Sequence, residues 1–181
     1  MIMAQPNSAG RGRLTLVLGG ARSGKSRHAQ ILAMATPPPW VYVATAEGLD
    51  DEMRQRIAKH KADRGDGWST IEAPIELARA VADALASAPL VVDCITLWLS
   101  NLMLGAHDID AAVAQFIKCL DGRRAPTFVV SSEVGAGLVP ETPLGRAYRD
   151  QAGIVNQHIA VSAHTVLLMV AGLAMPLKAL P

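Results

Sequence analysis

The segment GGARSGKS at residues 19–26 constrains the fold of this chain more than any other stretch. It follows the apolar run LTLVL at residues 14–18, which predicts a buried strand, and it precedes residues 26–35, which predict a helix. The pattern G-x-x-x-x-G-K-[ST] between a strand and a helix is typical of a phosphate-binding loop. Its glycines let backbone N–H groups surround phosphate oxygens, and the helix N-terminus adds positive charge. We expect Lys25 to reach the β- and γ-phosphates of a nucleotide and Ser26 to ligate Mg²⁺.

The rest of the chain predicts strands that alternate with helices. Short apolar runs predict further strands at residues 40–45, 68–72, 90–93, 127–131 and 164–170. Composition and apolar spacing predict helices at residues 50–64, 75–86, 96–104, 109–120 and 144–161. Apolar strands separated by helices indicate an α/β fold, a three-layer sandwich of the P-loop NTPase type with a mostly parallel central sheet. We expect residues 1–13 to be a flexible tail and residues 14–181 to form one domain.

Composition narrows the class of protein. Half of the 181 residues are apolar and 18% are charged, which excludes a disordered or fibrous chain. The formal net charge is +1, whereas a general nucleic-acid binder needs many cations against phosphate. Cys94 and Cys119 are too few for a disulfide framework or a four-cysteine zinc site, so we expect a reducing, cytoplasmic setting. The apolar run at residues 166–176 is shorter than the roughly 20 residues of a membrane span, so we expect no membrane insertion.

The strand predicted at residues 90–93 ends in a carboxylate, Asp93. Beside a phosphate loop, this LVVD segment has the form of a Walker-B strand, whose acid helps to hold Mg²⁺. The alternative is that Asp93 caps a helix that begins near Thr96. The chain lacks the Asn-Lys-x-Asp segment that GTPase switches usually carry, and it is short for a large ATPase motor. Its length favours a small-molecule kinase or a nucleotidyltransferase.

Beyond the phosphate loop, the chain carries a series of short segments with polar, charged or glycine residues. They are YVATA (42–46), DEM (51–53), RIAKHK (56–61), Trp68 with Glu72, DCITL (93–97), NL (101–102), EVG (133–135), GLVP (137–140), RDQAG (149–153) and NQ (156–157). In order and spacing, together with GGARSGKS, they resemble one family. It is the bifunctional adenosylcobinamide kinase/adenosylcobinamide-phosphate guanylyltransferase family of cobalamin biosynthesis, and the resemblance runs from residue 16 to residue 171.

This resemblance implies two reactions. A nucleoside triphosphate, ATP or GTP, phosphorylates the aminopropanol hydroxyl of adenosylcobinamide. GTP then gives its GMP unit to a histidine with release of pyrophosphate, and the cobinamide phosphate attacks that guanylylated histidine to form adenosylcobinamide-GDP. His60 matches the histidine nucleophile by position, so we predict His60 and Lys25 as catalytic residues. We expect Mg²⁺ at Ser26 and Asp93, and the resemblance implies a homo-oligomer, by analogy a trimer.

The spacing of the residues around His60 supports its assignment as the nucleophile less than the family resemblance does. Met53, Ile57, His60 and Arg64 are spaced four, three and four residues apart, which places them on one face of the helix predicted at residues 50–64. A neutral imidazole is a competent nucleophile, and its attack at phosphorus would form a phosphoramidate. On spacing alone, a helix-face histidine without a catalytic role is the better interpretation. The assignment therefore rests on the resemblance.

We predict a set of GTP- and phosphate-binding residues along the first half of the chain. They are Gly19, Gly20, Ala21, Arg22, Ser23, Gly24, Lys25, Ser26, Ala44, Thr45, Ala46, Lys61, Ala62, Asp63, Arg64, Glu72 and Asp93. The resemblance implies the contacts at residues 44–46 and at Glu72, and Lys61 and Arg64 are cations close to the predicted nucleophile. The alternatives are an ordinary strand-to-helix turn at 44–46, a solvated acid at Glu72 and a surface salt bridge at Arg22.

Residues further along the chain offer less specific signals. Glu133 follows a predicted strand and could be the base for the hydroxyl in the kinase step, although we prefer that it orders its own loop. Arg149, Asp150, Asn156 and Gln157 could line the corrinoid side, and the first two could instead pair with other charges.

Two other functions fit the phosphate loop. A kinase for a different alcohol or nucleotide would be indifferent to replacement of His60. A non-catalytic GTP-sensing module would bind GTP but release no pyrophosphate when cobinamide phosphate is added.

The remaining histidines have no metal-ligand spacing, so we interpret them as structural: His28, His107, His158 and His164.

Overall fold

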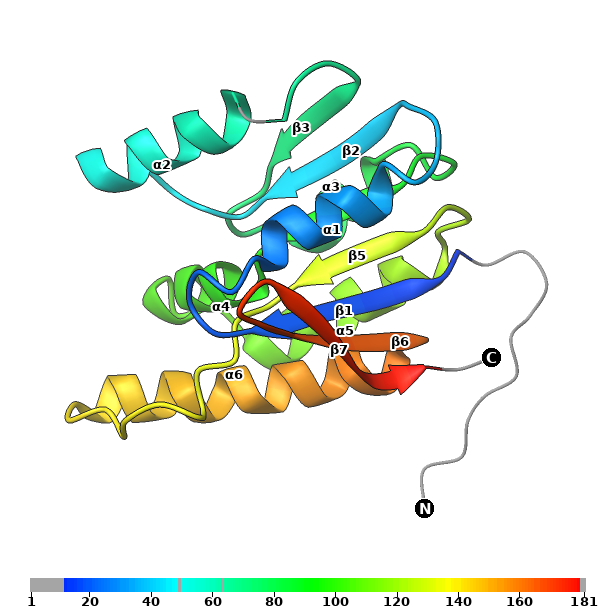
Figure 1. Ribbon diagram of the computed structural model, residues 1–181. Coiled ribbons are helices and arrows are strands. Elements are labelled where there is room, and N and C mark those ends of the chain that lie inside the picture. The colour runs from blue at the N-terminus through cyan, green and yellow to red at the C-terminus, as the bar shows by residue number, and fades with distance from the viewer. Residues whose placement is uncertain (1–11, 49, 63, 180–181) are drawn as a thin grey trace.

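Seven strands form one sheet in the computed structural model, which describes residues 12–48, 50–62 and 64–179 (Figure 1). Their order along the sheet is β3-β2-β4-β5-β1-β6-β7, and all neighbours pair in parallel except β6 and β7. The strands are β1 (Leu14–Gly19), β2 (Trp40–Ala44), β3 (Trp68–Glu72), β4 (Leu90–Asp93), β5 (Thr127–Val130), β6 (Thr165–Val170) and β7 (Leu173–Ala179). The predicted α/β fold with a mostly parallel sheet is confirmed. Most of the predicted tail lies outside the described residues.

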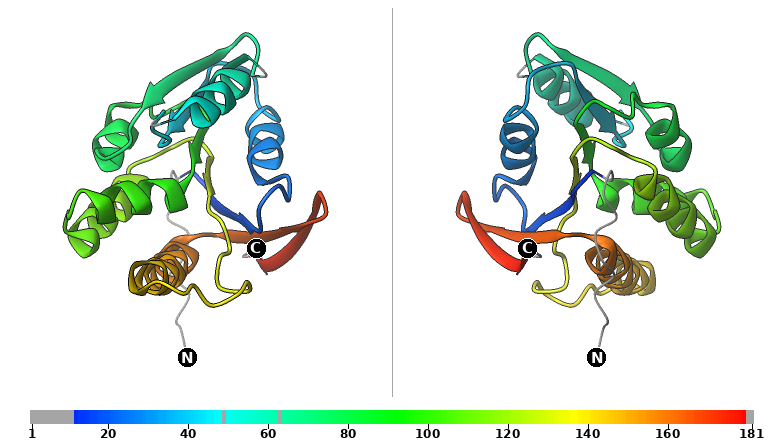
Figure 2. Two further views of the ribbon diagram at one scale, coloured as in Figure 1. Left: turned by 90° about the vertical axis from the view of Figure 1, so that its left-hand side faces the viewer. Right: turned by 90° about the vertical axis from the view of Figure 1, so that its right-hand side faces the viewer.

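Helices cover both faces of the sheet. They are α1 (Lys25–Ala33), α2 (Asp51–Ala62), α3 (Leu77–Asp83), α4 (Ile95–Leu104), α5 (Ile109–Asp121) and α6 (Pro143–Ser162). α1 covers one face, against β4 and β5, and α3 to α6 form a four-helix layer on the other (Figure 2). α2 lies beside β2 and β3, and none of its described side chains belongs to the buried apolar clusters. In the described part of the chain, no helix is long and apolar enough to span a bilayer.

The strands divide their side chains between two apolar cores. Leu16 and Val92 face the four-helix layer, whereas Val17 and Val91 face α1, and all four are fully buried. A parallel sheet that is covered on both faces needs apolar residues at nearly every strand position. This is why the strands appear in the sequence as continuous apolar runs.

The last strand differs from the prediction. We expected residues 164–170 to be the final strand, but Leu173–Ala179 forms β7 along the edge of β6. Ala171 and Gly172 make the two-residue turn, with φ values of 50° and 82°. Alanine seldom adopts a positive φ, so this hairpin carries little sequence signal. Pro176 obscured the strand further, because proline is tolerated in a sheet mainly on an edge strand.

The carboxyl ends of the parallel strands lie at one edge of the sheet, here called the carboxyl edge. Ligands of open α/β sheets bind at this edge, because the loops that follow the strands converge there. β5 lies between β1 and β4, and adjacent strands are about 4.8 Å apart, so the ends of β1 and β4 lie on the order of 10 Å from each other. α1 crosses this interval, since it packs on both β4 and β5.

A buried arginine ties two loops together at the opposite edge. Arg123 is 3% exposed, and its guanidinium donates to the carbonyl oxygens of Ala84, Leu85 and Ala88. Its Nε donates to Oγ1 of Thr127 at 3.1 Å. Burial lowers the pKa of Arg123, and the surrounding acceptors compensate for the lost hydration of the cation. The side chain therefore joins the loop before β4 to the start of β5.

We predict that Arg123→Met lowers the free energy of unfolding by about 2–4 kcal/mol, because several carbonyl groups lose their donor while staying buried. Urea denaturation measures the change. The neighbouring Arg124 is exposed, so Arg124→Met is the matched control and should change the stability by less than about 0.5 kcal/mol. Equal effects of the two substitutions would contradict a specific role for Arg123.

Candidate active site

The phosphate loop connects β1 to α1 at the carboxyl edge. Lys25 is the first residue of α1 and is 9% exposed, and its Nζ donates to the carbonyl oxygen of Gly20 at 2.6 Å. Gly24 caps the helix with a φ of 94°, a conformation that glycine adopts without strain. A Cβ on Gly19 would come 2.6 Å from the carbonyl oxygen of Met169, so glycine is required there. The loop thus curls around the ammonium group of its own lysine.

The hydroxyl of Ser23 is buried within this loop and has no hydrogen-bond partner among the described residues. Buried polar side chains are nearly always paired, so an orphaned hydroxyl indicates a site for a polar ligand. A phosphate oxygen held by the loop would accept a hydrogen bond from Ser23. The loop therefore has a suitable donor for an anion in addition to its backbone N–H groups and Lys25.

Asp93 ends β4, and the neighbouring strand holds its carboxylate. The hydroxyl of Tyr42 on β2 donates to Oδ2 of Asp93 at 2.7 Å. Burial raises the pKa of Tyr42 far above its ordinary value, and the charge of Asp93 raises it further, so the phenol remains a donor. Burial and Asp93 also raise the pKa of Cys94, while the positive charge of Lys25 opposes this rise.

Thr45 joins the ends of β2 and β4. Its buried Oγ1 donates to the carbonyl oxygen of Cys94 at 2.7 Å and accepts from the N–H of Cys94 at 2.8 Å. Its own N–H donates to the carbonyl oxygen of Asp93 at 3.1 Å, and its carbonyl accepts from Nδ2 of Asn101 at 2.9 Å. Every polar group of Thr45 has a protein partner. Thr45 thus positions the two strand ends, and its contact with a nucleotide stays a prediction.

The predicted nucleophile His60 is half-buried on α2, and two contacts tie the end of this helix to the carboxyl edge. The Nζ of Lys61 pairs with the carboxylate of Glu72, the last residue of β3. Arg64, two residues beyond the helix, is 9% exposed, and its guanidinium carbon lies 4.0 Å from the centroid of the Tyr42 ring. The helix that carries His60 thus ends close to the edge where the phosphate loop and Asp93 lie.

Arg64 is packed inside the protein. Its Nη2 donates to Oγ1 of Thr70 at 3.2 Å, and the ring of Tyr42 beneath it packs edge-on against Trp68, with centroids 6.1 Å apart. We predicted that Arg64 binds phosphate, but the structure places its guanidinium on an aromatic ring. A cation over the face of a buried ring is attracted by the quadrupole of the ring, so this position is stable without a carboxylate partner.

The predicted nucleotide-binding residues differ widely in exposure. The exposed members are Gly20, Ala21, Arg22, Lys61, Ala62 and Glu72, the half-buried members are Gly24, Ser26, Ala44, Ala46 and Asp93, and the buried members are Gly19, Ser23, Lys25, Thr45 and Arg64. Asp63 lies outside the described residues. Met53 and Ile57, which we placed on the same helix face as His60, are half-buried and join neither core.

The loop after β5 is held by side chains that we considered for the corrinoid side or the kinase base. Oε1 of Glu133 accepts from the N–H of Gly135 at 2.6 Å, and Arg149 donates to the carbonyl oxygen of Gly135 at 2.8 Å. Asn156 is buried and accepts from Oγ of Ser131 at 2.6 Å. These bonds agree with our preference that Glu133 orders its own loop. The other two residues that we considered for the corrinoid side, Asp150 and Gln157, are exposed on α6.

The donors at the carboxyl edge fit Mg²⁺. This ion prefers oxygen ligands, and it commonly takes one or two from the protein and others from substrate phosphates and water. The hydroxyl of Ser26 and the carboxylate of Asp93 are donors of this kind. Within the described residues, no group of three or more His, Cys, Asp or Glu side chains could hold a metal. The residues therefore suit a metal that binds together with a nucleotide.

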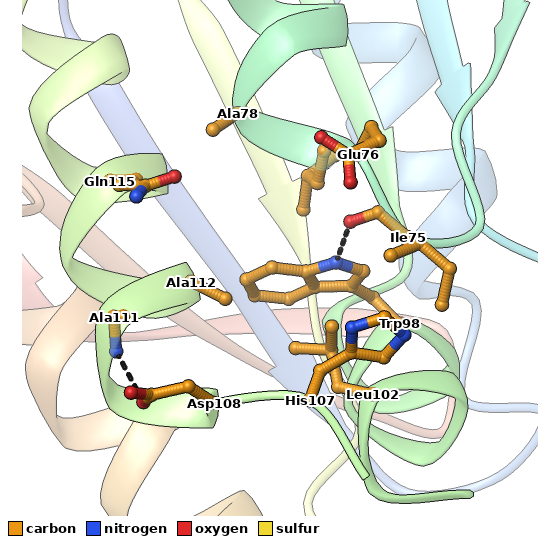
Figure 3. A pocket seen from close by; sticks show the side chains of 11 residues that line it. Ile75, Glu76, Ala78, Trp98, Leu102, His107, Asp108, Ala111, Ala112 and Gln115 are labelled. Atoms are coloured by element: carbon orange, nitrogen blue, oxygen red, sulfur yellow. Dashed lines mark hydrogen bonds between the residues drawn. The ribbon is translucent and has the colours of Figure 1, made fainter. Parts of the chain in front are cut away.

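A cavity of about 170 Å³ lies elsewhere, in the four-helix layer (Figure 3). Trp98 forms part of its wall, with Nε1 donating to the carbonyl oxygen of Ile75 at 2.8 Å. Asp108 lies at its rim and accepts from the N–H of Ala111 at 3.0 Å. None of the residues predicted to bind nucleotide lines this cavity, so it is separate from the candidate site.

Sequence reasoning missed the hydrogen-bond partners that position the site, above all the hydroxyl of Tyr42 and the amide of Asn101. Both lie in segments that carry the family resemblance, but neither belongs to a motif with a stated mechanism. The missing information is the strand pairing. Tyr42 is in register with Val91, which puts Asp93 one diagonal step away on the same face of the sheet.

Comparison with known proteins agrees with these features. Residues 15–177 match the family described as cobinamide kinase / cobinamide phosphate guanyltransferase. The bifunctional adenosylcobalamin biosynthesis protein CobP of Pseudomonas aeruginosa is 44% identical over 169 residues, which cover 92% of this chain and 98% of that protein. The proteins named CobU from Salmonella typhimurium and Escherichia coli are 38% and 36% identical over 181 residues, with 91% of this chain and 99% of each relative covered.

Solved structures add a likeness in fold. A Pyrococcus horikoshii OT3 protein superposes with a TM-score of 0.53 at 11% identity, over 94% of this chain and 88% of that one. The RadB recombinase superposes with a TM-score of 0.53 at 16% identity, over 88% of this chain and 74% of that one. These identities are too low to indicate a shared activity. The family match, in contrast, covers nearly the whole chain and includes the phosphate loop, so this chain belongs to the cobinamide kinase / cobinamide phosphate guanyltransferase family.

Proposed function

We propose that this chain is a bifunctional enzyme of cobalamin biosynthesis that modifies adenosylcobinamide in two steps. In the first, the γ-phosphoryl group of ATP or GTP passes to the aminopropanol hydroxyl oxygen, which loses its proton, and the nucleoside diphosphate leaves. In the second, GTP gives its GMP unit to the cobinamide phosphate by way of His60. The observation that carries this proposal is that a phosphate loop and the end of the helix bearing His60 lie at one edge of the sheet.

The phosphate loop supports both steps, because each step breaks a phosphorus–oxygen bond of a bound nucleoside triphosphate. The backbone of the loop, the Lys25 ammonium and the Ser23 hydroxyl would hold the phosphates and stabilise the charge that develops on them. Ser26 and Asp93 would hold Mg²⁺, which neutralises phosphate charge when bound. The guanosine end is assigned to the turn at residues 44–46 and to Glu72, which follow or end the neighbouring strands β2 and β3.

His60 is the proposed nucleophile of the second step. An imidazole nitrogen attacks the α-phosphorus of GTP, the bond to the α–β bridging oxygen breaks, and pyrophosphate leaves. A phosphate oxygen of the cobinamide phosphate then attacks the same phosphorus, the nitrogen–phosphorus bond breaks, and adenosylcobinamide-GDP forms as the free imidazole returns. Lys61, adjacent to His60 and paired with Glu72, supplies a cation close to this chemistry.

We predict that His60→Ala abolishes the covalent guanylyl-enzyme and leaves the kinase step. Wild-type protein treated with GTP labelled at the α-phosphorus should retain the label after denaturation and lose it in acid, because a phosphoramidate is the expected linkage. His158 is exposed on α6, so His158→Ala is the control and should label like the wild type. A wild-type protein without label, or a labelled His60→Ala variant, would refute the assignment.

We predict that Lys25→Met slows both half-reactions by about 10²–10³-fold, because the loop loses its buried cation for the transferring phosphates. Release of nucleoside diphosphate and of pyrophosphate reports the two steps separately. Lys118 is exposed on α5, and Lys118→Met should retain full turnover. Unchanged rates in Lys25→Met would show that catalysis takes place outside the phosphate loop.

We further propose that the enzyme is a homo-oligomer that associates through the β6–β7 hairpin. Leu173, Met175 and Leu177 alternate along the edge strand β7 and are 75%, 48% and 56% exposed. β7 is the last strand of the sheet, and in Figure 2 it lies at the margin of the molecule. An apolar edge strand presents unpaired backbone groups and apolar side chains, which can pair with another chain. A second copy of the protein would therefore stabilise this surface. The trimer that the family resemblance implies is consistent with such an interface.

We predict that the double substitution Leu173→Glu with Met175→Glu converts the oligomer to a monomer of about 19.1 kDa, because charge on an apolar interface is costly to bury. Light scattering coupled to size exclusion measures the mass. Leu85 is 56% exposed but lies far from β7 in the fold, so Leu85→Glu is the control and should leave the mass unchanged. A monomeric wild-type protein would overturn the proposal.

A further inference from the structure

We propose that Tyr42 positions the Asp93 carboxylate for the metal that accompanies the nucleotide, and that Arg64 links this positioning to the helix that carries His60. The inference rests on the proposed function, in which Asp93 helps to hold Mg²⁺ and His60 takes up GMP. Tyr42 and Arg64 are positioning residues, since each acts through another residue and touches no reacting atom.

The first link is the hydrogen bond between Tyr42 and Asp93. Tyr42 is 4% exposed on β2, and its hydroxyl donates to Oδ2 of Asp93 at 2.7 Å. An aspartate carboxylate otherwise rotates over a broad range about its terminal bond. A hydrogen bond to one oxygen fixes this rotation, and the carboxylate would then present its other oxygen when a metal binds. The ring cannot shift to spoil the geometry, because Trp68 packs against it and β2 is fixed to β4.

The second link is the packing of Arg64 on the same ring. The guanidinium carbon lies 4.0 Å from the ring centroid, and the Nη2 donates to Oγ1 of Thr70 at 3.2 Å. Among the described residues, no carboxylate forms an ion pair with this arginine, so the ring face is its principal partner. A buried guanidinium that leaves this position would lose both contacts, which anchors the residue.

Because Arg64 follows the end of α2 in the chain, its buried contacts connect this helix to Tyr42 and Asp93. Arg64 lies two residues beyond the end of α2, and its N–H donates to the carbonyl oxygen of Lys61, the neighbour of His60, at 3.4 Å. The other tether of this helix end, the Lys61–Glu72 pair, is exposed and therefore contributes little. The path from the end of α2 through Arg64 and the Tyr42 ring to Asp93 is thus the buried connection between this helix and the proposed metal site.

The experiment measures metal affinity, which does not depend on turnover. Mn²⁺ replaces Mg²⁺ as a paramagnetic probe, and its binding is titrated with the enzyme saturated by a GTP analogue whose α–β bridge is a methylene group. Tyr42→Phe keeps the ring but removes the hydroxyl, and should weaken Mn²⁺ binding about 10- to 100-fold, as is typical when a metal ligand loses its hydrogen-bond partner. Binding of the analogue without metal should be unchanged.

Tyr148→Phe is the matched control. Its hydroxyl is also half-buried and donates one hydrogen bond, to the carbonyl oxygen of Thr96 at 3.0 Å, but it does not contact Asp93. Tyr148→Phe should leave Mn²⁺ affinity unchanged, which separates positioning from a general loss of stability. If Asp93→Asn weakens Mn²⁺ binding and Tyr42→Phe does not, the inference fails while the metal site stands. If Asp93→Asn has no effect, the proposed metal site fails and the inference falls with it.

The link through Arg64 is tested by a double-mutant cycle. Arg64→Met should weaken Mn²⁺ binding and also lower the extent of His60 guanylylation, and its effect on Mn²⁺ should largely disappear in the Tyr42→Phe background. Arg64→Lys keeps the charge but loses the planar stacking group, and should give an intermediate loss even if the methionine variant is unstable. Independent, additive effects of the two substitutions, or an unchanged Mn²⁺ affinity in both Arg64 variants, would overturn the link.

Discussion

Four hydrogen bonds of Thr45 fix the carboxyl ends of β2 and β4 relative to each other at the candidate site. β2 and β4 both end there. β2 is followed by α2, which carries the proposed nucleophile His60, and β4 ends in Asp93, the proposed metal ligand. A buried polar network that is fully satisfied specifies one arrangement, whereas a partly satisfied one is destabilising. Because Thr45 is fully satisfied, the exits of the two strands are fixed relative to each other. Asp93 is thereby held by its backbone and, through Tyr42, by its side chain.

The two proposed reactions place different demands on this site. They use one phosphate loop, but the alcohol attacks the γ-phosphorus of the nucleotide and His60 attacks the α-phosphorus. The attacking groups therefore cannot occupy the same place. A histidine on a core helix would stand at a fixed distance from both phosphorus atoms. α2 instead lies outside the apolar cores and is attached to the sheet through specific contacts at the end that carries His60.

The sequence predicts the sheet well because both faces of its parallel strands are buried, which produces apolar runs that no other element explains. It predicts the phosphate loop because three residue types are required there at fixed spacing. The β6–β7 hairpin was missed, since Ala171 occupies a turn position where glycine or asparagine would have been the signal. The buried position of Arg64 could not be predicted, because it depends on the pairing of β2 with β3 and on the ring of Tyr42, neither of which is local in sequence.

A sheet of this kind tolerates many sequences, as the superposition with RadB at 16% identity shows. Its cores need apolar volume, and valine, isoleucine and leucine supply that volume almost interchangeably. The carboxyl edge needs particular atoms: a phenol oxygen on Asp93, a hydroxyl between two strand ends and a planar cation on a ring. The segments YVATA and DCITL, which carry part of the family resemblance, contain the residues that make the first two of these contacts. A resemblance first noticed as a string of short matches thus has a physical basis, because those matches are the places where the structure requires one side chain and no other.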